Sequence, residues 1–193
     1  MSRLTYENDT YRCKLECGQC DFIKDNGQRC RNRVCMGVPT CWQHTRREYG
    51  VRQRQSTIPG AGKGLFATED FSEDEWIVPY EGERITTRCL NQRYPGNTTA
   101  TYATSQNRGA IDAACRRGIA SVANGLFTNT GRTRTQNAHN ARIEERGANR
   151  DLWLRANHDI SANEEIFVYY GKDYRLEDDH TTKRNRKPDT RPC

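Results

Sequence analysis

The chain has 193 residues, of which 34% are hydrophobic and 29% are charged, and its formal net charge is +6 at pH 7. This length leaves room for one ordinary domain and one small appendage. No apolar run approaches the roughly 20 residues that a membrane-spanning helix needs, and the polar start MSRLTYENDT lacks the apolar core of a secretory signal. We therefore expect an intracellular protein without membrane contact. The modest positive charge fits an acidic or phosphate-bearing partner, and equally fits ordinary solubility.

The sequence divides into five segments. They are a polar leader (1–12), a Cys/His segment (13–47), a short linker (48–55), a long segment with apolar runs (56–175) and a charged tail (176–193). The leader and the tail show no apolar periodicity, so both are expected to be flexible. The two remaining long segments are expected to fold.

Most of the cysteines gather in the Cys/His segment. In a chain without a secretory signal, such clustering is typical of metal ligands rather than of disulfides. The candidate zinc ligands are Cys13, Cys17, Cys20, Cys30, Cys35, Cys41 and His44. The other cysteines, expected to be free thiols, are Cys89, Cys115 and Cys193.

Spacing favours four of these ligands. Cys41 and His44 are one helical turn apart and can reach the same ion, while Cys20 and Cys30 enclose a knuckle-like stretch with turn-forming residues. Seven candidates nevertheless exceed one tetrahedral site, so the count leaves one and two zinc ions open. A metal would fold a segment too short for a core of its own. Its arginines would suit nucleic acid or a histone tail, although a solvated face is the simpler interpretation.

Short runs in the long segment predict strands, because they are rich in aromatic and β-branched residues and bounded by turn formers. These runs are LFA (65–67), WIVPY (76–80), LWLRA (152–156) and IFVYY (166–170). The best helical candidate, IDAACRRGIASVANG (111–125), is interrupted by two glycines. A mostly β domain with short helices is expected. The glycines of PGAGKG (59–64) suit a tight backbone path that a ligand can approach closely.

Four stretches carry a family resemblance in order along the long segment. They are STIPGAGKGLFATEDFSEDEWIVPYEGERIT, TYATSQNRGAIDA, GIASVANG with QNA downstream, and LWLRANHDISANEEIFVYYGKDY. Together they resemble the SET domain of protein-lysine methyltransferases. The resemblance implies a fold of small β-sheets with short helices, S-adenosylmethionine as cofactor and a protein lysine as methyl acceptor. With its Cys/His module, the chain also resembles the SET proteins of large DNA viruses.

The resemblance implies a set of cofactor-binding residues that act mainly through backbone contacts and one asparagine. This set is Gly62, Lys63, Gly64, Leu65, Tyr102, Asn124, Gly125 and Tyr170. Asn124 would hold the amino group of the cofactor. Gly125 stands where the family has a histidine, and its backbone can replace only the backbone contact of that residue.

The resemblance also implies catalytic tyrosines. Tyr170 would orient the lysine amine and the methyl group through its hydroxyl, while Tyr80 and Tyr174 would line a narrow channel that excludes water. Desolvation beside the positive sulfonium would lower the lysine pKa from about 10.4, so no dedicated general base is required.

Several positions depart from the family pattern. Ser121, Gly125 and Leu126 stand in place of an arginine, a histidine and a serine, Asn163 replaces a common glycine, and Tyr169 replaces a common aspartate. The loop LFTNTGRTRTQ, which contains Arg132 and Arg134, is longer than usual and would contact substrate or solvent. The cysteine-rich segment that often follows the domain is absent.

Two classes of function remain open. The first is methyl transfer to a histone tail or another basic nuclear protein, received by acidic residues at Glu81, Glu83, Asp112 and 177–179. The second is a non-catalytic SET and zinc module that binds chromatin or nucleic acid. The substrate class and the basic run KRNRK (183–187) favour the nucleus, or the host nucleus or virion for a viral protein. The target lysine, the number of methyl groups and the oligomeric state are not fixed by the sequence.

Overall fold

The computed structural model describes residues 15, 17–34, 38–94, 100–106, 109–128, 131 and 134–171, and the backbone of 4–7 and 10–13. Several predicted features lie outside these residues: Cys35, Tyr174, Arg132, Cys193, the tail and the side chain of Cys13.

The polar leader contains regular structure. Strands β1 (Leu4–Glu7) and β2 (Thr10–Cys13) pair antiparallel, with Leu4 opposite Cys13. The prediction of a flexible leader is therefore wrong for these residues. The reason lies in the side chains, because threonine and tyrosine favour strands even where apolar periodicity is missing.

The Cys/His segment folds around a short hairpin and a helix. Strands β3 (Gly18–Gln19) and β4 (Arg33–Val34) pair antiparallel, and helix α1 (Trp42–Tyr49) follows. Gly50 ends α1 in the left-handed conformation, with φ at 61°, and its amide donates to Arg46 O.

The predicted linker 48–55 is wrong, because most of it belongs to the folded domain. Strand β5 (Val51–Gln55) begins directly after Gly50 and pairs with β6 (Lys63–Ala67). Sheet pairing and the complete burial of Val51 hold this polar sequence as a strand. Strand β13 (Glu165–Ile166) completes a three-stranded sheet in the order β13-β6-β5.

A second sheet has the order β14-β11-β12-β7. Its strands are β14 (Val168–Tyr169), β11 (Ala141–Arg146), β12 (Asp151–Ala156) and β7 (Trp76–Pro79). All four predicted runs are confirmed as strands, although the run 166–170 divides at Phe167 between the two sheets. The division has a local cause: buried Asn140 accepts from Phe167 N at 2.7 Å and donates to Glu165 O at 2.8 Å.

A third sheet, of order β8-β10-β9, carries the second helix. Its elements are β8 (Glu83–Ile85), α2 (Thr87–Arg93), β9 (Ala103–Gln106) and β10 (Gly109–Asp112). The Thr86 hydroxyl caps α2 by accepting from Cys89 N. The interrupted helical candidate contributes the end of β10 and the 3-10 helix η1 (Ile119–Val122), and a second 3-10 helix, η2, spans Gln136–Ala138.

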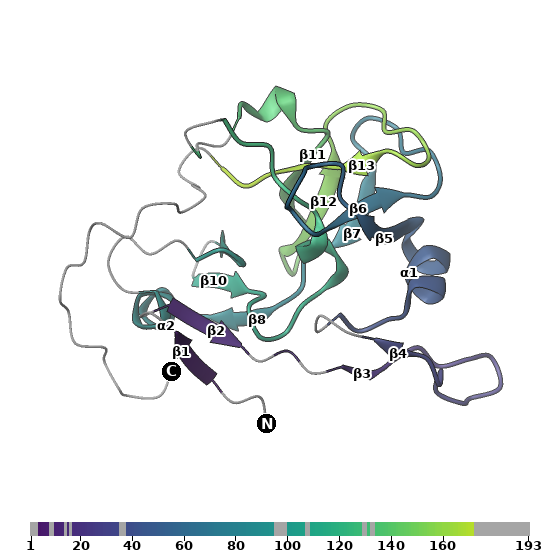
Figure 1. Ribbon diagram of the computed structural model, residues 1–193, viewed down its shortest axis with the longest axis horizontal. Coiled ribbons are helices and arrows are strands. Elements are labelled where there is room, and N and C mark those ends of the chain that lie inside the picture. The colour runs from purple at the N-terminus through teal and green to yellow at the C-terminus, as the bar shows by residue number, and fades with distance from the viewer. Residues whose placement is uncertain are drawn as a thin grey trace.

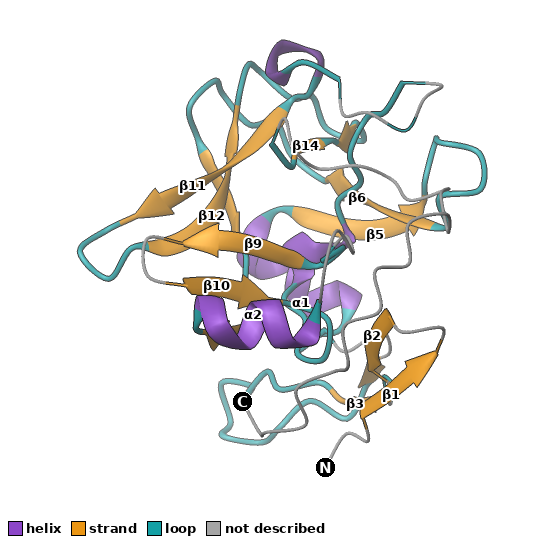
Figure 2. Ribbon diagram, turned by 90° about the vertical axis from the view of Figure 1, so that its left-hand side faces the viewer, coloured by secondary structure: helices purple, strands orange, loops and turns teal. Residues whose placement is uncertain are grey.

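The sheets surround a single main core, and the fold is the predicted mostly β architecture of small sheets with short helices. Figure 1 shows α1 beside β5, and Figure 2 shows α2 against the sheet of β9 and β10. No helix among the described residues is long and apolar enough to cross a membrane.

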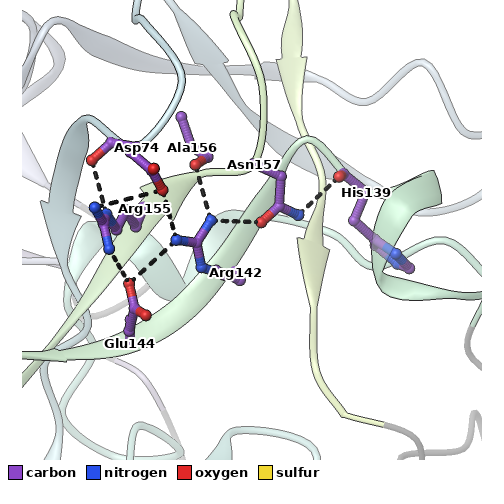
Figure 3. Close-up of polar contacts among 7 residues, drawn as sticks. All are labelled: Asp74, His139, Arg142, Glu144, Arg155, Ala156 and Asn157. Carbon is purple, nitrogen blue, oxygen red and sulfur yellow. Dashed lines mark hydrogen bonds and ion pairs between the residues drawn. The ribbon is translucent and has the colours of Figure 1, made fainter.

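A polar network connects the second sheet to Asp74, in the loop directly before β7 (Figure 3). Arg142 donates to Ala156 O at 3.0 Å and Asn157 Oδ1 at 2.9 Å, and pairs with Asp74 at 2.8 Å. Asn157 in turn donates to His139 O at 2.9 Å. The hydrogen bond from Arg142 lowers the pKa of Asp74. This network holds the start of β11, two residues after His139, against the end of β12.

Candidate functional site

The glycine-rich turn before β6 brings backbone close to other elements. Gly62 has φ at 74° and open space beside it, as a ligand cradle requires. A Cβ atom at Gly64 would lie 2.1 Å from Glu165 Oε1, so only glycine allows this approach. Leu65 is fully buried in the middle strand of its sheet, where it pairs with Gln53 on one side and Ile166 on the other.

Asn124 connects the glycine turn to strands β13 and β14. Its Nδ2 donates to Lys63 O at 3.0 Å and lies 3.2 Å from both Ser56 Oγ and Glu165 Oε1. Its carbonyl accepts from Val168 N at 2.8 Å. The structure therefore brings together three predicted cofactor residues, Lys63, Gly64 and Asn124. Asn124 lies 61 residues after Lys63 in the sequence.

Glu165 is a site residue that sequence reasoning missed. It is 3% exposed and accepts from Ser56 Oγ at 2.7 Å and from Thr57 N and Oγ1, both at 2.6 Å. Burial acts to raise the pKa of Glu165, but the hydrogen bonds from Thr57, Ser56 and Asn124 outweigh it and hold the pKa below its usual value. The signal in the sequence was the acidic pair Glu164-Glu165 directly before the apolar run 166–170.

Tyr170 lies against the Asn124 segment. Its hydroxyl donates to Ala123 O. A Cβ atom at Gly125 would come within 2.9 Å of Tyr170 Cδ2 and 3.0 Å of Phe127 Cζ. The glycine that replaces the family's histidine thus has a steric cause, because aromatic rings occupy the space beside it.

Tyr80 and Tyr102 form a second aromatic pair. Tyr80 is 4% exposed, and its hydroxyl donates to Tyr102 O at 3.0 Å. The guanidinium of Arg117 lies 3.8 Å from the centre of the Tyr102 ring. Tyr80 is a core residue in this conformation, and Tyr102 and Tyr170 pack against the same core.

Two further departures have packing reasons. Tyr169 packs edge to face on the buried ring of His139, with ring centres 5.5 Å apart. Asn163 has φ at 73°, a left-handed conformation that asparagine tolerates, and its Oδ1 accepts from Arg52 at 2.8 Å. Arg134, from the long loop, donates through its backbone to Leu126 O and through its side chain to Phe127 O.

The predicted acidic surface for a basic peptide is largely wrong. Asp112 is fully buried, pairs with Arg93 at 2.8 Å and accepts from the Tyr94 hydroxyl. Glu83 also pairs with Arg93, at 2.6 Å, so neither carboxylate is available as an unpaired partner. A cavity of about 710 Å³ between β8 and α2 is lined by Glu83 together with Arg84, Arg88 and Arg93, and by none of the predicted catalytic or cofactor-binding residues. Glu81 remains as an exposed acid.

The four cysteine and histidine residues favoured by spacing come together. The ligand atoms of Cys20, Cys30, Cys41 and His44 all lie within 4.8 Å of one another. His44 Nδ1 is 3.5 Å from Cys20 Sγ and 3.3 Å from Cys41 Sγ. Zinc bonds of about 2.3 Å to sulfur and 2.0 Å to nitrogen place tetrahedral donors roughly 3.3–3.8 Å apart, so the cluster could form a zinc site.

Groups around this cluster support thiolate ligands. Asn32 donates through its backbone to Cys30 Sγ and through Nδ2 to Cys41 Sγ, while Cys41 N donates to Cys20 Sγ. Burial acts to raise the pKa of Cys41, but hydrogen bonds led by that of Asn32 lower it to about 6. The ring of Phe22 stacks on His44 at 3.8 Å and fixes its orientation.

The remaining described cysteines differ from expectation. Cys17, Cys89 and Cys115 are disulfide-bonded. The prediction of free thiols at Cys89 and Cys115 is wrong, and Cys17 has no thiolate to offer a metal. A disulfide depends on Cβ atoms that the fold brings to about 4 Å, which sequence spacing does not reveal.

Comparison with known proteins defines the class of the chain. The SET domain model matches residues 62–171, more than half of the 193 residues. The chain therefore belongs to the SET-domain family. No curated protein matches it.

Solved structures give the same fold. The polycomb repressive complex 2 of Chaetomium thermophilum is similar at 26% identity and a TM-score of 0.50, with 64% of this chain and 15% of that chain covered. The same complex bound to GSK126 gives 25% identity and a TM-score of 0.50, covering 65% and 16%. The methyltransferase domain of human PR domain-containing protein 2 gives 19% identity and a TM-score of 0.45, covering 72% and 88%. This chain thus spans about 15% of the length of the polycomb chain that it matches.

Proposed function

We propose that the chain transfers a methyl group from S-adenosylmethionine to a lysine of a protein, with a histone tail as the substrate class. The observation that carries this proposal is the convergence of Tyr170, Asn124 and the Gly62 to Gly64 turn. These three elements are joined through Ala123 O and Lys63 O, although they come from distant parts of the sequence.

The glycine turn fits the cofactor. The open space beside Gly62 leaves the backbone of the turn accessible, and the fit at Gly64 keeps that backbone against Asn124. Asn124 and the exposed backbone at Lys63 would hold the amino and carboxylate ends, and the bound cofactor would supply the electrophilic methyl group. Glu165 fixes this turn by accepting from Ser56 and Thr57 directly before it.

The tyrosines would prepare the lysine amine. A direct displacement needs a neutral amine aligned with the methyl group and shielded from water. Tyr170, which is half-buried at the end of β14, would accept or donate a hydrogen bond at the amine, while the Tyr80 and Tyr102 pair would support the adjoining wall. Burial beside a positive cofactor would lower the lysine pKa, so the side chains here need only orient and desolvate.

The similarity to the polycomb repressive complex 2 of Chaetomium thermophilum motivates the choice of a histone substrate and a nuclear setting in this proposal. We propose further that zinc is held by Cys20, Cys30, Cys41 and His44 and supplies folding energy rather than chemistry. The viral resemblance stays a prediction.

Calorimetric titration with S-adenosylmethionine tests the cofactor site. The wild-type chain should bind with micromolar-range affinity, and Asn124→Ala should weaken binding by about tenfold or more because it removes the hydrogen bonds of a charge-bearing ligand. Asn137→Ala on the exposed η2 is the matched control and should bind as wild type. Absence of binding by the folded wild-type chain would overturn the proposal and leave a SET fold without cofactor chemistry.

A further inference from the structure

The Cys/His module exposes a large aromatic side chain. Trp42, the first residue of α1, is 61% exposed, and Ile23 in the knuckle is 56% exposed. Among the described residues, these are the two exposed large apolar side chains. Neither contributes to the core. The solvent-exposed indole of Trp42, at a fixed position on a helix, can contact a partner.

Exposed arginines occur in the same part of the module as this tryptophan. Arg46 lies one turn after Trp42 on the same side of α1. Asn32 donates to Gln43 Oε1 at 3.1 Å and to Cys41 Sγ at 3.3 Å, so its neighbours Arg31 and Arg33 lie beside the start of the helix. We name this surface the Trp42 face; it comprises Arg31, Asn32, Arg33, Trp42, Gln43 and Arg46. All six residues are exposed.

The charges of the Trp42 face are not neutralised internally. Within the described part of the chain, Arg31, Arg33 and Arg46 make no salt bridge, whereas Arg29 of the same module pairs with Asp21 at 2.5 Å. Three exposed arginines without a salt bridge among the described residues, on the same module as an open indole, complement a partner that carries both negative charge and flat rings.

We propose that the Trp42 face binds single-stranded nucleic acid. An unpaired base would stack on the indole of Trp42, and the guanidinium groups of Arg31, Arg33 and Arg46 would contact the flanking phosphates. An acidic peptide would satisfy the arginines but has no ring for the indole. A duplex keeps its bases stacked within itself and so cannot use Trp42. This inference concerns a surface apart from the proposed methyl-transfer site and does not depend on that activity.

Fluorescence anisotropy of a labelled oligothymidylate with the full-length, zinc-loaded chain tests the proposal. Trp42→Ala should weaken binding by roughly five- to 150-fold, and Trp42→Phe should recover much of it, because a phenyl ring still stacks. Arg46→Ala should reduce the slope of log affinity against log salt by about 0.7, as expected for one lost phosphate contact. The matched control is Arg116→Ala, which removes one exposed arginine from outside the module.

Each outcome decides the proposal. Zinc content and far-ultraviolet circular dichroism must match wild type in each variant, so that a loss of binding reports the surface and not the fold. Unchanged affinity in Trp42→Ala would overturn the proposal. A loss of affinity in Arg116→Ala equal to that in Arg46→Ala would overturn it in favour of general charge attraction. Stronger binding to a duplex or to polyglutamate than to the single strand would overturn it as well.

Discussion

Glu165 shows how one buried carboxylate can organise a cofactor site. It accepts from two residues before the glycine turn and lies 3.2 Å from Asn124 Nδ2, so it fixes both sides of the proposed cradle. A family resemblance could identify the glycines and the asparagine, because these follow motif positions. The resemblance covers Glu165 as well but did not reveal its role, since that role depends on Ser56 and Thr57, more than 100 residues earlier in the sequence.

Replacing Glu165 by glutamine tests this role. Glutamine has one accepting oxygen where glutamate has two, so we expect a stability loss of about 1–3 kcal/mol and a 10- to 100-fold drop in methyl transfer. The folded-state pKa of Glu165 lies below its ordinary value of 4.5, so its contribution is present above that pH and is lost as pH falls through the folded pKa. Urea unfolding at several pH values should therefore show a flatter acid limb in Glu165→Gln. The exposed Glu69→Gln is the control, and identical acid limbs would contradict the role of Glu165.

The family departures also make sense at the level of single residues. Gly125 leaves room for Phe127 and Tyr170, and Tyr169 packs on His139. Each replacement looked like a loss when compared with a motif, yet each is matched by a neighbour from the longer loop. Pairwise packing of this kind is invisible in a single sequence, because the matching residues have no fixed spacing.

The loop between Asn124 and β11 is the element in which this chain departs most from the pattern of its family. His139 anchors it: His139 Nε2 accepts from Leu126 N at 2.9 Å, and Nδ1 lies 2.9 Å from Thr135 O. These contacts require the neutral tautomer that carries its proton on Nδ1. Burial lowers the pKa of His139 from its ordinary value of 6.5, in agreement with a neutral ring.

This anchoring predicts a pH dependence. A histidine with a lowered folded-state pKa stabilises the fold fully above pH 6.5, and the contribution is lost as pH falls through the folded pKa. Wild type should lose stability between neutral and mildly acidic pH, and His139→Gln should lose less over that interval while being about 1–3 kcal/mol less stable at neutral pH. Chemical unfolding at stepped pH measures both, with the exposed His158→Gln as control. An equal pH slope in His139→Gln would rule out this anchor.

Strands were predictable where side chains carried the signal. The runs in β6, β7 and β12 are aromatic and branched, and β12 alternates outward and buried residues as a half-buried strand must. Strand β5, with the sequence VRQRQ, has little apolar character, and its structure comes from pairing with β6. Because β5 depends on this pairing, sequence reasoning placed it in a linker.

At the scale of the whole molecule, the Cys/His module is continuous with the SET domain. Helix α1 passes through Gly50 directly into β5, whose first residue Val51 is part of the main core (Figure 1). The module and the domain should therefore influence each other's stability. The cluster of four candidate zinc ligands was predictable because thiolate and imidazole spacing is a local signal, whereas the disulfide of Cys17 was not.

Metal removal tests this coupling. The chain should contain about one zinc ion per molecule, since the described residues gather one complete set of four ligands. A strong chelator, or Cys41→Ser, should remove the zinc and lower the melting temperature of the whole chain by several degrees, because a few kcal/mol of metal-linked folding energy is lost. Mass spectrometry of metal content with calorimetry measures both quantities, and the exposed Gln43→Ala should retain its zinc. A chain that melts identically without metal would refute the coupling.

The central claim of methyl transfer is tested most directly by mass spectrometry of a histone mixture after incubation with S-adenosylmethionine. Wild type should add methyl groups to lysine, Tyr170→Phe should reduce the rate by about 100-fold or more while S-adenosylmethionine binding persists, and Tyr169→Phe should act as wild type. If Tyr170→Phe keeps full activity, this tyrosine has no part in the reaction. If the folded wild-type chain methylates no histone, the assignment of histones as its substrate is contradicted.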